Sequence, residues 1–338
     1  MRYLIITEAN QNVATGHFME VVELSTELKK RGHTVKVLVN NECPDGLLKR
    51  LSCGYYEYKK SIDEDRISII GIITREQPDV VITNLREIQN EDILRIRSVF
   101  KKSVVCIDEF GNRTLDADII INPMVDSLFW KYSNSSGKVY AGHKYLVLPE
   151  SIKTYHDKEK KINREINKVC ISMGGVDPKG TTVKIVKWLP QLFGSVTAEV
   201  ILGAGFRFNE ELRVEERKLP ETIVVNISKN VSNIYDFFYE ADLAFCAGGN
   251  TLHELACIGT PAIVIPTNAH EENNGKKFER MGAAICLSDA SSIYTKKIME
   301  VSKMLSRDAR RIMSNRGKAC CTGEGVKLTA DICETYVK

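Results

Sequence analysis

The chain has 338 residues, of which 43% are hydrophobic and 27% are charged. These proportions are typical of a globular protein and exclude intrinsic disorder. The length suggests about two domains. Lysines and arginines exceed aspartates and glutamates only by 47 to 44, and this small excess argues against a nucleic-acid partner.

Neither membrane insertion nor export is expected. No apolar run reaches the ~18 residues needed to cross a bilayer, and the apolar start Met1–Thr7 is too short for a signal peptide. The ten cysteines include no C-x-x-C pair, and several lie in apolar runs where a thiol acts as a small hydrophobe. The sequence therefore predicts a cytoplasmic protein with reduced thiols.

The first half of the chain alternates strand-like runs with helical patterns. Apolar residues between Phe18 and Leu28 recur at helical spacing, and Arg31-Gly32 is expected to end that helix. A further helix is expected at about residues 86–100. Strands are expected at Tyr3–Thr7, Thr34–Val39, Val80–Thr83, Ser103–Asp108 and Asp118–Asn122. Repeated strand–helix–strand units predict a parallel sheet with helices on both faces.

The pattern restarts after a polar segment at residues 151–167, which is expected to be a solvated hinge. A helix is expected from about Lys179, with Asp177 as its N-cap and Pro178 at its first position. The second set of strands is expected at Val169–Ser172, Glu199–Leu202, Thr222–Val225, Leu243–Cys246 and Ala262–Ile265.

These elements predict two Rossmann-like domains, residues 1–155 and 165–338, with the last helix crossing back to the first domain. Because ligands of such sheets bind at the carboxyl ends of the strands, we expect the site in a central cleft between the domains.

Thr15-Gly16-His17 lies between the first strand and the first helix. A glycine permits a tight turn there, and the start of a helix favours an anion. A histidine at this point can act as a general base or acid near neutral pH. The alternative is that His17 occupies the first turn of a surface helix without a chemical role.

Ala247–Leu255 follows the strand Leu243–Cys246 and reads Ala-Gly-Gly-Asn-Thr-Leu-His-Glu-Leu. Two glycines before Asn250-Thr251 predict a turn and a helix start that can bind phosphate. Asn250 and Glu254 are four residues apart and share a helix face, where the carboxylate can accept hydrogen bonds from a ribose. The alternative is an ordinary strand–turn–helix junction.

The remaining signals are weaker. Gly174-Gly175 and Gly203-Ala204-Gly205 each follow an expected strand and indicate turns. The chain has no Walker A motif and no G-x-G-x-x-G after the first strand, which disfavours an NTPase and a dinucleotide oxidoreductase. His143 and His253 are possible site residues, but a structural or surface role is expected for each. His270-Glu271-Glu272 lacks metal-ligand spacing, so no metal is expected there.

Together these motifs resemble the PseG/SpsG family of UDP-sugar hydrolases, which act in pseudaminic acid and spore-coat polysaccharide synthesis and are related in fold to the MurG glycosyltransferase. The loop ending in Gly16-His17 and the Ala247–Leu255 motif carry the resemblance. It continues in Ile107–Arg113, similar to the family's Asp-Asp-Leu-Ala-Asn-Arg, in Gly142–Glu150, and in Gly323–Val326.

The resemblance implies a GT-B fold that takes a UDP-sugar substrate and needs no metal or other cofactor. His17 matches the family's catalytic histidine, which activates water against the anomeric carbon. Glu254 would bind the ribose of UDP, and the helix that begins at Asn250 would bind the diphosphate. The residues expected to contact the substrate are Gly16, Gly174, Gly175, Gly248, Gly249, Asn250, Thr251 and Glu254.

The sequence departs from the family at several positions, among them Asn268–Asn273, where the family has Asp-Asn-Gln, and two positions that lose an arginine. Ile6 and Glu20 stand where the family has arginines, and the second change reverses the local charge. We therefore expect nucleotide binding to be kept and sugar binding to be altered. Three hypotheses follow: a UDP-sugar hydrolase, a GT-B glycosyltransferase in which an acceptor hydroxyl replaces water, and a sugar-nucleotide-binding protein without catalysis.

Overall fold

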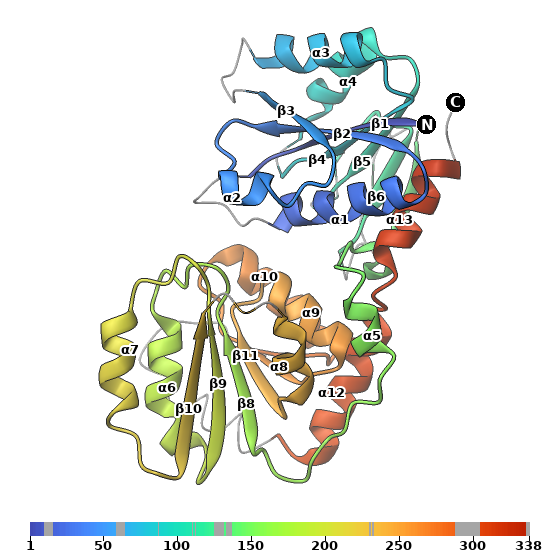
Figure 1. Cartoon of the computed structure of the whole chain (residues 1–338). Helices are drawn as coiled ribbons and strands as arrows, with labels where there is room; N and C mark the ends of the chain where they lie inside the picture. Colours follow the sequence, from blue (N-terminus) through green and yellow to red (C-terminus); the bar gives the residue numbers. More distant parts are fainter. Residues whose placement is uncertain are drawn as a thin grey trace. The chain divides into compact units, whose positions relative to one another are not determined.

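The computed structural model describes residues 1–9, 16–58, 65–86, 88–109, 111, 113–124, 132, 137–229, 231, 233–287 and 305–335. By its internal contacts the chain divides into two compact units. The first unit contains Met1–Glu150 and Gly323–Lys338, and the second contains Ser151–Thr322. Each unit is an α/β structure built on one sheet (Figure 1).

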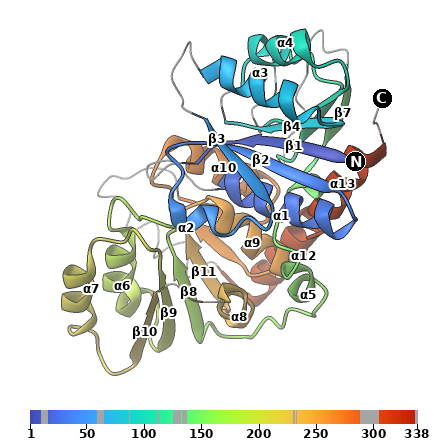
Figure 2. The same ribbon diagram turned by 45° about the horizontal axis from the view of Figure 1, so that its top comes forward.

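The first unit contains a seven-stranded parallel sheet in the order β3-β2-β1-β4-β5-β6-β7. Its strands are β1 (Arg2–Thr7), β2 (Thr34–Asn40), β3 (Gly54–Tyr58), β4 (Val80–Asn84), β5 (Ser103–Ile107), β6 (Ile119–Asn122) and β7 (Lys138–Ala141). Its helices are α1 (Gly16–Lys30), α2 (Asp45–Leu48), α3 (Asp65–Glu76), α4 (Asn90–Val99), η2 (His143–Tyr145) and α13 (Gly325–Thr335). Figure 2 shows α3 and α4 on one face of this sheet and α1 on the other.

The first sheet is buried on both faces because alternate residues of its strands point to opposite sides. In β1, Tyr3 and Ile5 pack with Phe18 and other residues of α1. Leu4 and Ile6 of the same strand pack in a second cluster with Ile93 of α4. An unbroken apolar strand in this sequence therefore indicates a central parallel strand covered by two helical layers.

The second unit contains a six-stranded parallel sheet in the order β10-β9-β8-β11-β12-β13. Its strands are β8 (Lys168–Ser172), β9 (Val196–Leu202), β10 (Ile223–Lys229), β11 (Leu243–Cys246), β12 (Ala262–Val264) and β13 (Ile285–Cys286). Its helices are α5 (Ile152–His156), α6 (Thr181–Leu192), α7 (Asn209–Glu216), α8 (Ile234–Glu240), α9 (Asn250–Ile258), α10 (Ala269–Arg280) and α12 (Arg307–Cys320). Figure 1 shows α6 and α7 on one side of these strands and α8 and α9 on the other.

The segment at residues 151–167, expected to be a solvated hinge, is exposed at most of its positions, but it also contains regular structure. It contains α5, in which Ile152 is fully buried, and α5 packs against α9. Lys160 donates hydrogen bonds to the carbonyl oxygens of Tyr239 and Ala241 at the end of α8. Composition alone suggests that a lysine is solvated, so the role of Lys160 in capping carbonyl groups could not be predicted from it.

The end of the chain packs in the first unit, where α13 lies against α1. Figure 1 shows α13, in red, beside the blue α1. Arg31 at the end of α1 forms ion pairs with Asp331 at 2.6 Å and Glu334 at 2.8 Å. A Cβ on Gly325 would lie only 1.8 Å from the carbonyl oxygen of Leu146, so this close approach requires glycine.

Some local predictions were also wrong. Asp177 is not the residue that begins α6: Gly180 is in the cap position, and Asp177 has a positive φ of 45°. Its carboxylate nevertheless accepts the backbone N–H groups of Thr181 and Thr182, both at 2.8 Å, so it caps the helix from the preceding loop. The helix expected at residues 86–100 begins at Asn90, and α3, β3, β7 and β13 were not predicted.

No helix among the described residues combines the length and the apolar character needed to span a bilayer. All ten cysteines are free thiols, and eight of them are buried.

Candidate active site and nucleotide-binding turn

His17 lies at the point where the strand order of the first sheet changes direction. From β1 the chain adds β2 and β3 on one side and then β4 and β5 on the other. Thr7, Asn84 and Ile107 align across β1, β4 and β5, so the loops that follow these strands leave the same edge. In open parallel sheets this switch point is where ligands bind.

A hydrogen-bonded network holds His17 at this edge. Its Nδ1 lies 2.9 Å from Oδ1 of Asn84, the last residue of β4. Because Oδ1 can only accept, Nδ1 carries the proton and donates it. The Nδ2 of Asn84 donates to Oε2 of Glu20 at 2.9 Å. Asn84 thus orients two side chains of α1, and the lone pair of neutral His17 lies on Nε2.

Acidic groups surround the imidazole. Nε2 of His17 lies 3.8 Å from Oε2 of Glu109, which comes two residues after β5. Burial alone lowers the pKa of His17, but the carboxylates of Glu109 and Glu20 outweigh it, so this pKa lies above its ordinary value. Burial, together with repulsion from Glu109, raises the pKa of Glu20 to about 7. Because His17, Glu20 and Glu109 place ligand atoms within 4.8 Å of one another, they could hold a metal ion.

The two positions that lose an arginine of the PseG/SpsG family have different surroundings. Ile6 is almost fully buried in the cluster between β1 and α4, where an arginine would lose its hydration. Glu20 is only 4% exposed and belongs to the His17 network. Gly16 begins α1 beside it. Thr15 of the same motif, and Phe110 and Asn112 of the Ile107–Arg113 segment, lie outside the described residues.

The second sheet has its own switch point between β8 and β11. Gly248 and Gly249 follow β11 there, and Gly248 has a φ of 103°, which favours glycine. A Cβ on Gly248 would lie 2.7 Å from the carbonyl oxygen of Glu271 and 2.9 Å from Val264. Next to Gly249 nothing lies within 4 Å of an added Cβ. Gly248 therefore shapes the turn, and Gly249 faces open space.

The helix α9 begins directly after this turn, with Asn250 exposed and Thr251 partly exposed. Its cap residue, Gly249, offers no side-chain hydrogen bond to the first N–H groups. One turn further, Glu254 accepts a hydrogen bond from the hydroxyl group of Tyr235 at 3.1 Å. Burial raises the pKa of Glu254 to about 7. A polar ligand could bind to the start of α9, which has no side-chain cap, and to this carboxyl group.

Gly174 and Gly175 follow β8 and leave the same edge, because Ser172 and Cys246 are partners in neighbouring strands. Both glycines are exposed. The loop after β9 packs against them: a Cβ on Gly203 would lie 2.4 Å from the carbonyl oxygen of Gly175. The structure therefore brings both glycine turns to one edge of the second sheet. The loop at Gly203 packs against the first of these turns.

His253 is structural, as the sequence predicted. It is 4% exposed, it packs on the ring of Phe278, and its Nε2 lies 3.0 Å from Nδ2 of Asn274. Asn274 also donates to the carbonyl oxygen of Gly248 at 2.6 Å, so both residues support the turn. Glu271 accepts from the N–H and hydroxyl groups of Thr267, both at 2.7 Å, in a structure that caps α10.

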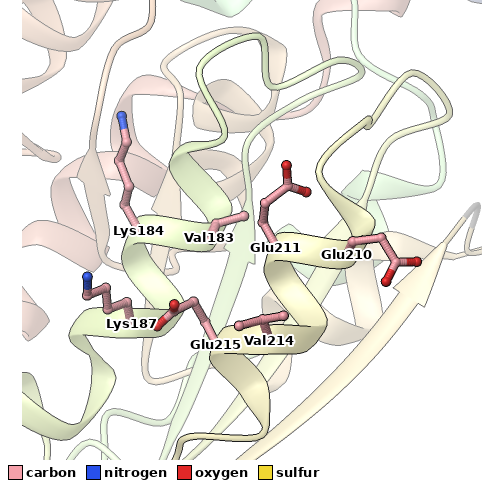
Figure 3. A pocket seen from close by; sticks show the side chains of 7 residues that line it. All are labelled: Val183, Lys184, Lys187, Glu210, Glu211, Val214 and Glu215. Atoms are coloured by element: carbon pink, nitrogen blue, oxygen red, sulfur yellow. The ribbon is translucent and has the colours of Figure 1, made fainter.

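A pocket of about 580 Å³ lies elsewhere in the second unit, between α6 and α7 (Figure 3). Lysines of α6 and glutamates of α7 surround two valines there, and no predicted site residue takes part.

The sequence did not predict Asn84, Tyr235 or the role of Glu109 at these sites. The usable signal for Asn84 was a polar residue at the end of an apolar strand next to β1.

Solved structures share this architecture over the whole chain. The crystal structure of MurG from Acinetobacter baumannii matches with a TM-score of 0.74 and 15% identity, covering 99% of both chains. Two parallel-sheet α/β units of this kind define the GT-B class, and at this identity the likeness establishes the fold.

Sequence relatives narrow the class. Residues 185–328 match the glycosyltransferase family 28 C-terminal domain. The spore coat polysaccharide biosynthesis protein SpsG of Bacillus subtilis is 22% identical, covering 91% of this chain and 95% of that protein. An uncharacterized protein of Methanocaldococcus jannaschii is 27% identical over 79% of this chain, which spans 56% of that relative's length. Together these matches support a likeness to SpsG- and MurG-like GT-B proteins.

A third relative matches the second half alone. The UDP-N-acetylglucosamine–N-acetylmuramyl-(pentapeptide) pyrophosphoryl-undecaprenol N-acetylglucosamine transferase of Carboxydothermus hydrogenoformans is 32% identical over 128 residues. This match covers 36% of this chain and 34% of that enzyme. The likeness in sequence to SpsG therefore extends through both units, whereas the likeness to this transferase covers about a third of the chain.

Proposed function

We propose that the protein is an enzyme that breaks the anomeric C–O bond of a UDP-linked amino or deoxy sugar with water as the acceptor. The observation that carries this proposal is the placement of His17, oriented by Asn84 at the switch point of the first sheet. The name of SpsG, a spore coat polysaccharide biosynthesis protein, supports a place in polysaccharide synthesis. The resemblance to the PseG/SpsG family extends this proposal to nonulosonic acids such as pseudaminic acid.

In this proposal the first unit activates the water and the second unit binds UDP. His17 takes a proton from the water at Nε2, the water oxygen bonds to the anomeric carbon, and the bond to UDP breaks as UDP leaves with the electron pair. The N–H groups at the start of α9 and the turn at Gly248–Gly249 bind the diphosphate and stabilise its developing charge. Glu254 accepts hydrogen bonds from the ribose.

A glycosyltransferase is the second candidate, with a hydroxyl group of an acceptor in place of water. The match to a glycosyltransferase domain over residues 185–328 favours it. A transferase of the MurG kind would need a membrane-docking surface, for which the leucines and basic residues of Leu47–Leu51 are a minor candidate. These leucines instead pack on the hydrophobic core, with Leu48 only 7% exposed. A third candidate, binding without catalysis, leaves the orientation of His17 unexplained.

UDP release from a panel of UDP-amino sugars, with no acceptor added, tests the proposal. A hydrolase releases UDP and free sugar, and His17→Asn abolishes the release. UDP release that requires an added acceptor identifies a transferase. Tight UDP binding without turnover under either condition identifies a binding protein. We retain the predictions of a cytoplasmic location and of a small-molecule substrate without a nucleic-acid partner.

A further inference from the structure

The outermost strand of the second sheet leaves one of its sides unpaired. Among the described strands, β10 pairs only with β9, and Figure 1 shows it at the margin of that sheet. It is seven residues long and reads Ile-Val-Val-Asn-Ile-Ser-Lys, with its one charged residue, Lys229, at the end. Val224 is 49% exposed. A long strand of β-branched residues at a sheet edge is a template for pairing with another chain.

The other edges of the two sheets have features that discourage such pairing. β13 has two residues, and β7 has four and begins with Lys138. β3 contains Glu57. Beside it, the cationic groups of Lys36 and Arg75 lie over the ring of Tyr56. Short strands and charged side chains are common protections of an edge, and β10 has neither before its last residue.

The hydrogen bonds to β9 show which backbone groups of β10 face the open side. The carbonyl oxygen of Thr222 accepts the N–H of Val196 on β9 at 3.1 Å. Because the residues of a parallel strand direct their N–H and C=O groups alternately to its two sides, Asn226 also faces β9. Val225 and Ile227 therefore direct their N–H and C=O groups outward. Within the described part of the chain, these groups have no hydrogen-bond partner.

Opposite charges lie at the two ends of β10. Glu221 comes two residues before the strand, and Lys229 ends it. Both side chains are exposed, and neither forms an ion pair with another described residue. In an antiparallel pair of β10 strands, Lys229 of each copy lies opposite Ile223 and diagonally across from Glu221 of the other copy. A parallel pair would bring like charges together, so the charges favour the antiparallel arrangement.

We propose that β10 pairs antiparallel with β10 of a second copy of this chain, about a twofold axis at Asn226. In this register all residues of the strand overlap, and Val225 of each copy exchanges both N–H···O bonds with Ile227 of the other. These two side chains pack on the core of the second unit and are partly exposed in the single chain. The pairing covers them with their counterparts and joins the two sheets into one.

The inference goes beyond the proposed function and does not depend on it. Size-exclusion chromatography with light scattering on the full-length protein, from low to high micromolar concentration, tests it. We expect a dimer.

Charge variants test the antiparallel register. Lys229→Glu should weaken dimerisation at least tenfold, because it places a like charge across from Glu221. Adding Glu221→Lys to that variant should restore the dimer, since the opposite charges meet again. Arg95→Glu makes the same change of charge on the exposed side of α4 in the first unit, and should leave dimerisation unchanged. Circular dichroism confirms that each variant is folded.

A disulfide tests the position of the twofold axis. Facing residues of a non-hydrogen-bonded antiparallel pair have Cα atoms about 4.5 Å apart, which a disulfide can span. Asn226→Cys should therefore form a covalent dimer under mild oxidation. Ser228→Cys is the matched control, because in this register it faces Val224 of the second copy. Both variants keep the ten native thiols, so a native cysteine would cross-link them equally.

A chain that stays monomeric at every concentration overturns the pairing. A dimer that Lys229→Glu does not weaken and Asn226→Cys does not capture also overturns it, because another surface must then form that dimer. Equal capture by Asn226→Cys and Ser228→Cys overturns the register.

Discussion

The two units use the same topology to build opposite kinds of sites. In the first unit, charged and polar side chains meet at the switch point: His17, Asn84, Glu20 and Glu109. In the second unit the same edge is made of glycine turns and the start of a helix whose cap residue makes no side-chain hydrogen bond. Side chains can transfer protons and bind metals. Backbone N–H groups can bind phosphates, but they do not act as an acid or a base. Under the proposed function, the chemistry belongs to the first unit and nucleotide binding to the second.

Replacing His17 by asparagine gives the largest expected effect. Asparagine keeps a polar group but removes the imidazole that activates the water, so UDP release should fall by about 10²–10⁴-fold. UDP affinity, measured by calorimetry, should stay within about threefold of the wild type because the glycine turns are untouched. A variant that retains full turnover would remove His17 from the mechanism and erase the distinction between the units.

The turn of the second unit is tested by two glycines with different surroundings. Gly248→Ala places a Cβ at a φ of 103° and 2.7 Å from a backbone oxygen, so it should deform the turn. We expect UDP affinity to fall by about 2–4 kcal/mol. Gly249→Ala meets no atom within 4 Å and should change affinity by less than about 0.5 kcal/mol. Equal effects of the two substitutions would contradict the assigned geometry.

Glu254 tests whether a side chain contributes to nucleotide binding. Glu254→Ala should weaken UDP binding by about 1–3 kcal/mol, because ribose hydroxyl groups lose their acceptor. Tyr235→Phe removes only the hydroxyl group that donates to Glu254, and should change UDP affinity less than threefold. An unchanged dissociation constant for Glu254→Ala would leave the second unit with backbone contacts alone.

The smallest effect concerns stability and pH. Glu254 has a pKa of about 7 in the folded protein, above the value of about 4.3 in an unfolded chain. Between these values the folded state keeps a proton that the unfolded state releases, so this group lowers the free energy of unfolding as pH rises, and the loss levels off above pH 7. Relative to Glu254→Gln, the wild type should lose about 1–2 kcal/mol between pH 5 and pH 8. Urea denaturation curves at several pH values measure this, and parallel pH dependence in both proteins would refute the shift.

Local patterns in the sequence were sufficient to predict most of the parallel strands. β1, β4 and β11 are apolar runs bounded by polar residues or glycine, and burial on both faces requires this composition. The polar strand β3 and the short strand β13 were not predicted. Both lie at an edge of their sheet, where residues are partly exposed and the strand does not form an apolar run. The position of Asp177 was predicted wrongly for another reason. Its carboxylate caps α6 from the preceding loop, and residue spacing alone does not show in which direction a side chain points.

The sequence determined that two open α/β units would carry a histidine and two glycine turns at the carboxyl ends of strands, because periodicity and glycine placement are local properties of the chain. Only the tertiary structure decided which other residues meet them. Asn84 is 67 residues from His17 and Glu109 is 92 residues from it, and β1, β4 and β5 bring all three to one edge. Glu20 is a buried carboxylate that accepts a hydrogen bond from Asn84 beside His17 only because of that packing, since burial and proximity are properties of the assembled sheet.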